Sequence, residues 1–263
     1  MQSELMVMMW YGKTGTQFLT EAMNQQINLT GDIKRRYSRN ILLPEIGRAG
    51  QLELLQASVL VVGAGALGSI VSMYLAGSGI GRIGLCDFDT VDISNLQRQL
   101  SFTIDDVGCP KLEATVRRLS SINPDLIIEP HDGFLRHDKA RELFKRYDVI
   151  VEGSDNPATK HMVTDIANEV GKPCVLGGVN GFDGQVMTFL PGGKRYRDIF
   201  PDAVAEGGYT PCSIGGVLGP LPGIIGSIQA AEVIKIITGA GTTLADTLLL
   251  VNALDMTFTR IKL

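Results

Sequence analysis

Residues 59–68 decide the fold, and they read Val-Leu-Val-Val-Gly-Ala-Gly-Ala-Leu-Gly. The first four residues are apolar and mostly β-branched, which is typical of a strand buried on both faces of a parallel sheet. After the glycines, apolar side chains recur with the spacing of one helical face, at Leu67, Ile70, Val71, Tyr74 and Leu75. A strand, a glycine turn and a helix therefore follow one another directly, as in the first unit of an α/β fold.

The same alternation continues along the chain. We expect strands at 83–87, 126–129, 149–151 and 174–177, and helices at 110–121, 140–147 and 158–170. Further strands are expected at 185–190, 248–251 and 257–263, two short helices between 33 and 57, and an apolar helix over 224–237. The pattern predicts a doubly wound, Rossmann-like α/β fold, with a mostly parallel sheet, antiparallel C-terminal strands and helices on both faces.

The domain organisation follows from where this pattern begins and where it weakens. Residues 1–32 are weakly periodic and are interpreted as an N-terminal arm, whereas residues 33–263 form a single domain. Within it, about 191–222 is rich in glycine and proline and has hardly any periodicity. Because long connections of this kind are usually functional or mobile, we expect a mobile crossover loop there.

Composition excludes several classes of protein. The 263 residues carry 24 Lys plus Arg against 28 Asp plus Glu without a dense basic run, so a nucleic-acid partner is not expected. Cys86, Cys109, Cys174 and Cys212 are scattered, which argues against a disulfide framework and favours a reducing, cytoplasmic location. No apolar stretch approaches the roughly 20 residues of a membrane-spanning helix, so no membrane association is expected.

The glycine hexad suggests a phosphate site. Without side chains at Gly63 and Gly65, backbone N–H groups can approach phosphate oxygens at the positive end of a helix, and Gly68 completes the pattern. Asp87 ends the next strand, about twenty residues further on, where a carboxylate can bind ribose hydroxyls. These features fit an NAD(P)-dependent oxidoreductase, and the hexad alone also fits a tight turn that binds nothing.

A polar segment, residues 87–99, is too long for a simple turn from strand to helix. It reads Asp-Phe-Asp-Thr-Val-Asp-Ile-Ser-Asn-Leu-Gln-Arg-Gln and brings Asn95, Arg98 and Gln99 near the expected phosphates. This segment, together with residues 36–40, 63–68, 108–111, 154–156 and 215–226, resembles the ThiF/MoeB/HesA adenylyltransferases. That family is related to the adenylation domains of ubiquitin-activating enzymes, and the resemblance covers nearly everything after the N-terminal arm.

The resemblance implies an activity and its partners. The C-terminal carboxylate of a small ubiquitin-like sulfur carrier ending in Gly-Gly would attack the α-phosphate of ATP, giving an acyl-adenylate and pyrophosphate. It further implies Mg²⁺, a homodimer, a sulfur donor protein as another candidate partner, and a place in thiamine, molybdopterin or similar biosynthesis. Relatives with the same fold adenylate a peptide C-terminus or a modified tRNA nucleoside instead, and these alternatives stay open.

The resemblance also assigns roles to residues. Arg98 and Lys111 match cations at the phosphates, Arg39 an arginine inserted from the opposite subunit, and Asp155 a magnesium-binding carboxylate. Asp87 would hold the ribose, and the nucleotide would be lined by Ala66, Asp89, Ser94, Asn95, Leu96, Gln97, Arg98, Gln99 and Asn156. Taken singly, the residues allow plainer interpretations: Arg39 as an exposed helical arginine, Lys111 as a surface lysine, and Asp155 as a helix N-cap before Pro157.

Two expectations concern sulfur and zinc. Cys212 matches a cysteine that several relatives carry near the active site, where a thiolate could form an acyl disulfide or thioester or relay sulfur; otherwise it is a spare loop residue. Cys86, Cys109 and Cys174 are expected to be packing residues. Many relatives bind structural zinc through two C-x-x-C pairs, the first of which would fall near residues 195–198. Neither pair is in this sequence, so no zinc is expected.

Overall fold

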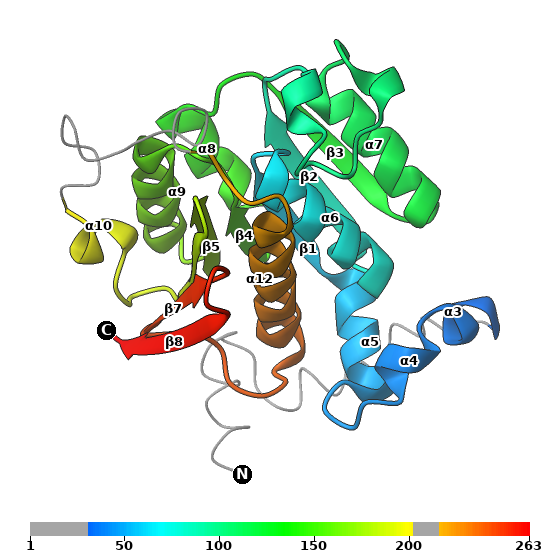
Figure 1. The fold of residues 1–263 in the computed structure, drawn as a ribbon. Helices are drawn as coiled ribbons and strands as arrows, with labels where there is room; N and C mark the ends of the chain where they lie inside the picture. Colours follow the sequence, from blue (N-terminus) through cyan, green and yellow to red (C-terminus); the bar gives the residue numbers. More distant parts are fainter. Residues whose placement is uncertain (1–30, 202–215) are drawn as a thin grey trace.

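The computed structural model describes residues 31–201 and 216–263, which fold around an eight-stranded sheet (Figure 1). Its strands lie in the order β3-β2-β1-β4-β5-β6-β7-β8. Strands β1 to β5 pair in parallel, and β6, β7 and β8 are added antiparallel. The strands are β1 (Ser58–Val62), β2 (Arg82–Asp87), β3 (Ile127–Asp132), β4 (Val149–Glu152), β5 (Cys174–Asn180), β6 (Asp183–Phe189), β7 (Thr247–Asn252) and β8 (Thr257–Lys262). The predicted fold class is confirmed.

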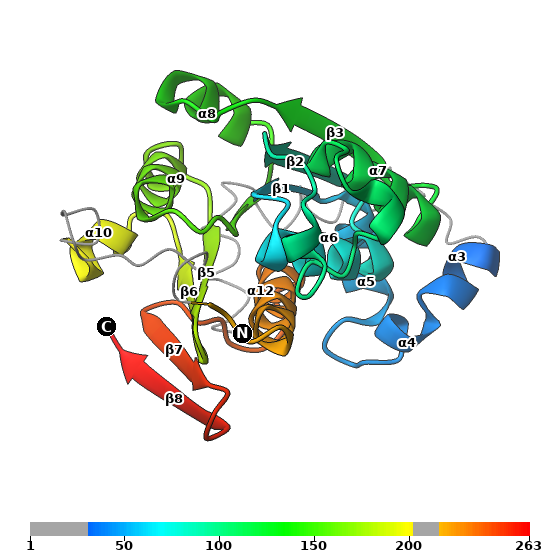
Figure 2. The same ribbon diagram turned by 45° about the horizontal axis from the view of Figure 1, so that its top comes forward.

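Helices cover both faces of the sheet (Figure 2). One face is covered by α5 (Gly47–Gln56), α6 (Ala66–Ser78), α7 (Lys111–Ile122) and α12 (Pro220–Thr238), and the other by α8 (His137–Phe144) and α9 (Pro157–Glu169). Residues 59–62 of strand β1 are all apolar because their side chains are buried on both faces of the sheet. Val59 and Val61 pack into the first core, Leu60 and Val62 into the second, and every residue of the strand is buried.

Some shorter elements differ from expectation. Where two helices were expected between 33 and 57, the structure has three: α3 (Gly31–Arg36), α4 (Ser38–Ile41) and α5. Helix α12 begins at Pro220, four positions before the expected start at residue 224. Helix α10 (Tyr196–Ile199) lies inside the expected crossover loop, because four residues are too few to show a helical period. Residues 1–30 and 202–215 lie outside the described residues, so the arm and the mobility of the loop stay predictions.

Charged side chains fasten α10 to α9. The Arg197 guanidinium donates to Asp165 of α9 at 2.7 Å, and Arg195 forms a longer ion pair with the same carboxylate at 3.8 Å. Arg195 also donates to Asp198 within the α10 segment at 2.8 Å. Between the two arginines, the Tyr196 ring lies 5.3 Å from the ring of His161. The pairing holds Tyr196 against the second core, in which it is buried.

Helix α12 corrects one expectation about membranes. It spans 19 residues and, among the described residues, is the one helix long and apolar enough to cross a bilayer by length and composition. It packs against α6, β5 and β6 (Figure 1), and its buried residues include the polar Gln229 and Glu232, both of which are hydrogen-bonded. Helix α12 is therefore a core helix of this domain.

The topology brings three connecting segments to one place. Strand β1 lies between β2 and β4, and its last residue, Val62, pairs with both Cys86 and Glu152. The chain therefore reverses its direction of winding beside β1, and the segments after β1, β2 and β4 leave the sheet at the same level. In open α/β sheets a crevice forms at such a switch point, beyond the carboxyl ends of the strands.

Candidate active site

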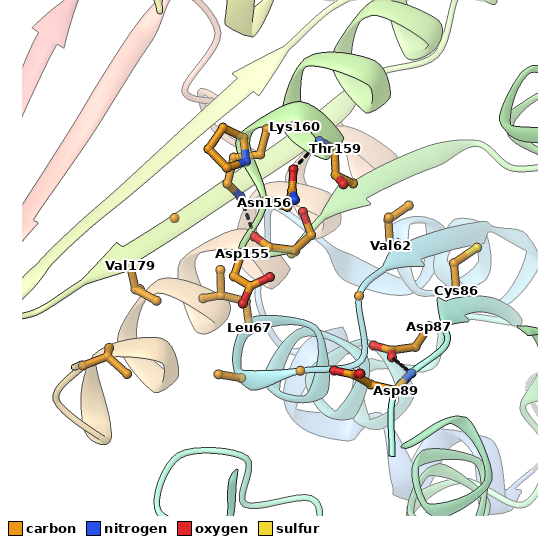
Figure 3. A pocket seen from close by; sticks show the side chains of 18 of the residues that line it. Val62, Leu67, Cys86, Asp87, Asp89, Asp155, Asn156, Thr159, Lys160 and Val179 are labelled. Atoms are coloured by element: carbon orange, nitrogen blue, oxygen red, sulfur yellow. Dashed lines mark hydrogen bonds between the residues drawn. The ribbon is translucent and has the colours of Figure 1, made fainter. Parts of the chain in front are cut away.

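A cavity of about 490 Å³ opens at this switch point (Figure 3). It is lined from all three segments, and one end reaches β5, β6 and β7. Ten of the residues expected at the site line it: Gly63, Gly65, Ala66, Asp87, Asp89, Arg98, Gln99, Lys111, Asp155 and Asn156. Residues that lie up to 93 positions apart in the sequence are thus brought to one pocket.

The glycine loop turns tightly from β1 into α6. Gly63 has a φ of +91°, which residues with a side chain rarely adopt. A Cβ atom at Gly68 would lie 1.7 Å from the Gly63 carbonyl oxygen, so this glycine permits helix and strand to pack closely and does not itself line the cavity. Among the described residues no side chain caps the amino end of α6 at Gly65, which leaves backbone N–H groups there for an anion.

Asp87 binds the glycine loop with its carboxylate. One oxygen accepts from the Ala64 N–H at 2.6 Å, and the other accepts from the N–H groups of Phe88 and Asp89, each at 2.8 Å. An ionised carboxylate has about four acceptor positions, so about one is left for a ribose hydroxyl. Asp87 therefore fixes the loop in addition to any role in binding sugar.

Two cationic side chains, Lys111 and Arg98, line the cavity. Lys111 begins α7, is only 6% exposed, and directs its ammonium to the Asp89 carboxylate at 2.9 Å. The interpretation of Lys111 as a surface lysine is therefore wrong. Arg98 lines the same cavity and is steadied by donating to the Ser94 carbonyl at 3.0 Å. The Lys111 ammonium and the Arg98 guanidinium together offer positive charge to phosphate oxygens.

Gln99 contributes a buried polar atom without a partner. The residue is 4% exposed and lines the cavity, and its Oε1 accepts no hydrogen bond from the described residues. An unpaired buried acceptor costs free energy, so a donor on a bound ligand would stabilise this side chain.

Asp155 and Asn156 have different tasks. Asn156 caps α9, because its Oδ1 accepts from the Thr159 N–H at 3.2 Å and Pro157 occupies the first turn. The interpretation of Asp155 as the N-cap is therefore wrong. The Asp155 side chain lies in the cavity, on the opposite side from Asp87 and Asp89 (Figure 3).

Three further groups line the cavity that sequence reasoning did not single out. Phe88 and Phe134 form an aromatic rim with ring centroids 5.7 Å apart and about two thirds of each side chain exposed. Gln185, Tyr196 and Leu250 line the end of the cavity that reaches the antiparallel strands. Lys160 forms an ion pair with Glu152. Burial raises the pKa of Glu152, and the charge of Lys160 opposes this shift.

Other expected residues lie outside this cavity. The cavity lining does not include Ser94, Asn95, Leu96 or Gln97. Asn95 instead accepts a hydrogen bond from the Asp92 N–H at 3.1 Å, which closes the short 3₁₀ turn η1 (Ile93–Asn95) that leads to Arg98. Arg39 is exposed on α4, next to the carboxyl ends of α6 and α7 and hence at the edge of the sheet opposite the cavity. Cys212 lies outside the described residues.

Thiol labelling should separate the cysteines. Burial raises the pKa of Cys86 to about 12 and that of Cys174 still further, so at about pH 8 almost no thiolate is present at either residue. We expect N-ethylmaleimide to leave both unlabelled in the native protein and to label both in guanidinium chloride, as read by peptide mass spectrometry. Labelling of Cys174 in the native protein at the rate of a free thiol would contradict the packing role.

Comparison with known proteins identifies the family of this chain. The model of the ThiF family matches residues 37–263. The chain is 42% identical over 232 residues to a "Sulfur carrier protein adenylyltransferase" of Thermus thermophilus, covering 86% of each chain. It is also 42% identical to the "SAMP-activating enzyme E1" of Haloferax volcanii, covering 85% of this chain and 83% of that one.

Other matches are longer proteins, or solved structures that are less similar in sequence. The "Probable adenylyltransferase/sulfurtransferase MoeZ" of Mycobacterium tuberculosis is 42% identical, and the chain spans 59% of its length. The solved structure of E. coli MccB with ATP has a TM-score of 0.71 at 24% identity, covering 94% of this chain and 77% of that one, which shows a shared fold. Since a family model covering residues 37–263 and two relatives of similar length agree, this chain belongs to the ThiF family.

Proposed function

We propose that this protein is an ATP-dependent adenylyltransferase that activates the C-terminal carboxylate of a small ubiquitin-like sulfur carrier ending in Gly-Gly. The observation that carries the proposal is one cavity in which the glycine loop, Arg98, Lys111 and Asp155 meet, and whose far end leads to the antiparallel strands. Of the two relatives of similar length, one is named a sulfur carrier protein adenylyltransferase and the other a SAMP-activating enzyme E1. An NAD(P)-dependent oxidoreductase is not supported, because these relatives are adenylyltransferases and activating enzymes.

The side chains suit an attack at phosphorus. A carboxylate oxygen of the carrier forms a bond to the α-phosphorus of ATP, the bond from that phosphorus to the bridging oxygen breaks, and pyrophosphate leaves. Negative charge gathers on the nonbridging and leaving oxygens, and cations held in place beforehand stabilise it. Arg98 and Lys111 supply this charge, the amino end of α6 supplies N–H donors, and the rim of Phe88 and Phe134 offers flat surfaces for a base.

Mg²⁺ fits the donor set as an ion shared with the nucleotide. The described residues contain no group of three or more His, Cys, Asp or Glu side chains that could hold a metal alone. Mg²⁺ typically takes one or two carboxylates together with phosphate oxygens and water, and Asp155 offers a carboxylate in the cavity. When bound, the ion would neutralise phosphate charge.

Asp155→Asn tests this assignment, since it removes the charge and keeps the shape. We expect the Mg²⁺ concentration for half-maximal ATP–pyrophosphate exchange to rise about tenfold and the rate to fall about a hundredfold. Binding of ATP without metal, measured by calorimetry, should change little. Asp138→Asn, at an exposed position on α8, is the matched control, and an unchanged Mg²⁺ requirement in Asp155→Asn would remove Asp155 from the metal site.

The far end of the cavity would receive the tail of the carrier. Its walls carry Gln185, Tyr196 and Leu250, and β5 contributes Gly178, which has no side chain. Among the described residues, this end of the cavity is lined by Asp183 and by no lysine or arginine, which does not suit a nucleic acid, so we place tRNA-nucleoside substrates second. A peptide C-terminus stays an alternative with the same chemistry.

The function is tested by ATP–pyrophosphate exchange with a panel of carriers that end in Gly-Gly. We expect exchange only when a carrier is present, and none after its terminal glycine is removed. Exchange without any carrier, or with a plain peptide alone, would point to another substrate. The same proposal includes three predictions made from the sequence. They are a sulfur donor protein as a partner, a chemical role for Cys212 and a cytoplasmic location.

The position of Arg39 favours a shared site in a homodimer. Arg39 lies at the opposite edge of the sheet from the cavity of its own chain, so it can reach a nucleotide only in a second subunit. We expect Arg39→Ala and Lys111→Ala each to be inactive alone. After coexpression, about half of the dimers contain one subunit of each variant, and each such dimer has one intact site out of two. Activity should therefore return to about one quarter of wild type. Activity that stays at the level of the two parents would contradict the shared site.

A further inference from the structure

A pair of opposite charges is buried beneath the cavity, at the junction of β4 and α9. Glu152, the last residue of β4, has no exposed surface, and Lys160, in the first turns of α9, is 6% exposed. The Lys160 ammonium lies 2.5 Å from the Glu152 carboxylate. Replacing such pairs by apolar residues is often neutral or stabilising, so stability alone does not account for a pair at this depth.

All donors of the Lys160 ammonium are used inside the protein. Besides Glu152, it donates to the carbonyl oxygens of Ser154 and Gly177, each at 2.7 Å. An ammonium has three donors, so none is left for a phosphate although Lys160 lines the cavity. Its contribution to the site must therefore pass through the residues that it holds.

Those bonds converge on the turn of residues 153–156. Ser154 is bound at three points: its N–H donates to Glu152 at 2.9 Å, its hydroxyl donates to the same carboxylate oxygen, and its carbonyl accepts from Lys160. On the other side of Asp155, Asn156 is fixed as the cap of α9. Asp155 thus lies between two residues that are each held by hydrogen bonds, and Figure 3 shows Asp155 beside Asn156 and Lys160.

The turn also has no free space behind it. A Cβ atom placed on Gly63 would lie 3.1 Å from the Gly153 backbone, and one placed on Gly153 would lie 3.2 Å from the Gly68 nitrogen. From α12, Gln229 donates to the Glu152 carbonyl at 2.9 Å. The ion pair adds to these contacts in fixing the turn that carries Asp155.

We propose that Glu152 and Lys160 are positioning residues, which hold the 153–156 turn so that the Asp155 carboxylate already faces the cavity before the nucleotide binds. This inference rests on the proposed function, in which Asp155 acts during adenylation. Preorganised side chains need no reorganisation at the moment of reaction, and a small misplacement of such a group costs far more in rate than in binding.

The double variant Glu152→Gln/Lys160→Met tests the proposal without leaving one buried charge unpaired. We expect the rate of carrier-dependent exchange to fall about a hundredfold, and the half-saturating Mg²⁺ concentration to rise about tenfold. Metal-free binding of ATP should remain close to wild type. The matched control is the exposed pair on α8, Glu142→Gln/Lys145→Met, for which we expect wild-type values because that pair lies at the surface.

Amide hydrogen exchange gives a readout that is independent of activity. In wild type without nucleotide, the Ser154 N–H should be strongly protected, and the double variant should lose this protection while core strands keep theirs. A folded double variant with a wild-type rate and Mg²⁺ requirement would overturn the positioning role. If the double variant does not fold, the wild-type measurement decides, since an unprotected Ser154 N–H would also overturn it. Absence of exchange activity in wild type with every carrier would instead overturn the proposed function.

Discussion

Replacing Lys111 with alanine is expected to reduce carrier-dependent ATP–pyrophosphate exchange by at least about a hundredfold, the usual cost of removing one preorganised charge-stabilising group. Lys111 is nearly buried and lines the same cavity as Arg98. In the structure its ammonium is held 2.9 Å from the Asp89 carboxylate, which keeps it in place before a phosphate arrives. Because the charge on the phosphates grows during the reaction, the turnover rate should fall more than the Michaelis constant for ATP rises.

The same variant should remain folded. The Asp89 partner is 61% exposed, so loss of this ion pair costs about 1 kcal/mol or less. Thermal unfolding checks that the loss of activity is not a loss of structure. Lys145→Ala, at an exposed position of α8, provides the control for removing a positive charge elsewhere. A Lys111→Ala enzyme with half of the wild-type turnover would show that Lys111 is not the cation at the phosphates.

Gly68→Ala should have the largest effect on the fold around the site. The new Cβ atom would lie 1.7 Å from the Gly63 carbonyl oxygen and 3.1 Å from a methyl group of Val61. The carbonyl belongs to the backbone and cannot turn aside, so α6 must move away from β1. We expect a loss of about 3 kcal/mol in the free energy of unfolding and, because the loop then loses its shape, no measurable ATP binding by calorimetry.

Gly77→Ala is the matched control in the same helix. A Cβ atom at Gly77 would meet no atom within 4 Å, and alanine is the better helix former. This variant should therefore gain about 0.5–1 kcal/mol in the free energy of unfolding and keep nucleotide binding. Urea denaturation compares the two variants. Equal stabilities for Gly68→Ala and Gly77→Ala would mean that α6 is not packed as closely on β1 as the structure has it.

The parts of the site that could be predicted are those encoded by short, continuous segments of the sequence. The order of β1, the glycine loop and α6 is local, since apolar runs and glycines lie within about twenty residues of one another. Asp87 was expected because it ends a strand at the carboxyl edge of the sheet, whereas Arg98, Lys111 and Asp155 were assigned through the resemblance to the ThiF/MoeB/HesA adenylyltransferases. Parallel topology then brings them together without further information.

The remaining parts of the site depend on the pairing of strands that lie far apart in the sequence, or on how deeply a side chain is buried. Gln185 and Leu250 share one wall because β6 and β7 pair in antiparallel register across 65 positions, which no local pattern encodes. Lys160 carried no signal either, since a lysine near the start of a helix is ordinarily a surface residue. Only the position of α9 against β4 shows that its ammonium is buried beside Glu152.

The fastening of α10 has a consequence for how the enzyme responds to its surroundings. Arg195 and Arg197 are partly exposed, and attraction between partly exposed charges weakens as the ionic strength of the medium rises. The hold on Tyr196 therefore loosens in concentrated electrolyte, whereas Lys111, which lines the same cavity, is nearly buried and less screened. A rise in salt concentration would then weaken binding of the proposed carrier tail before it weakens binding of the nucleotide.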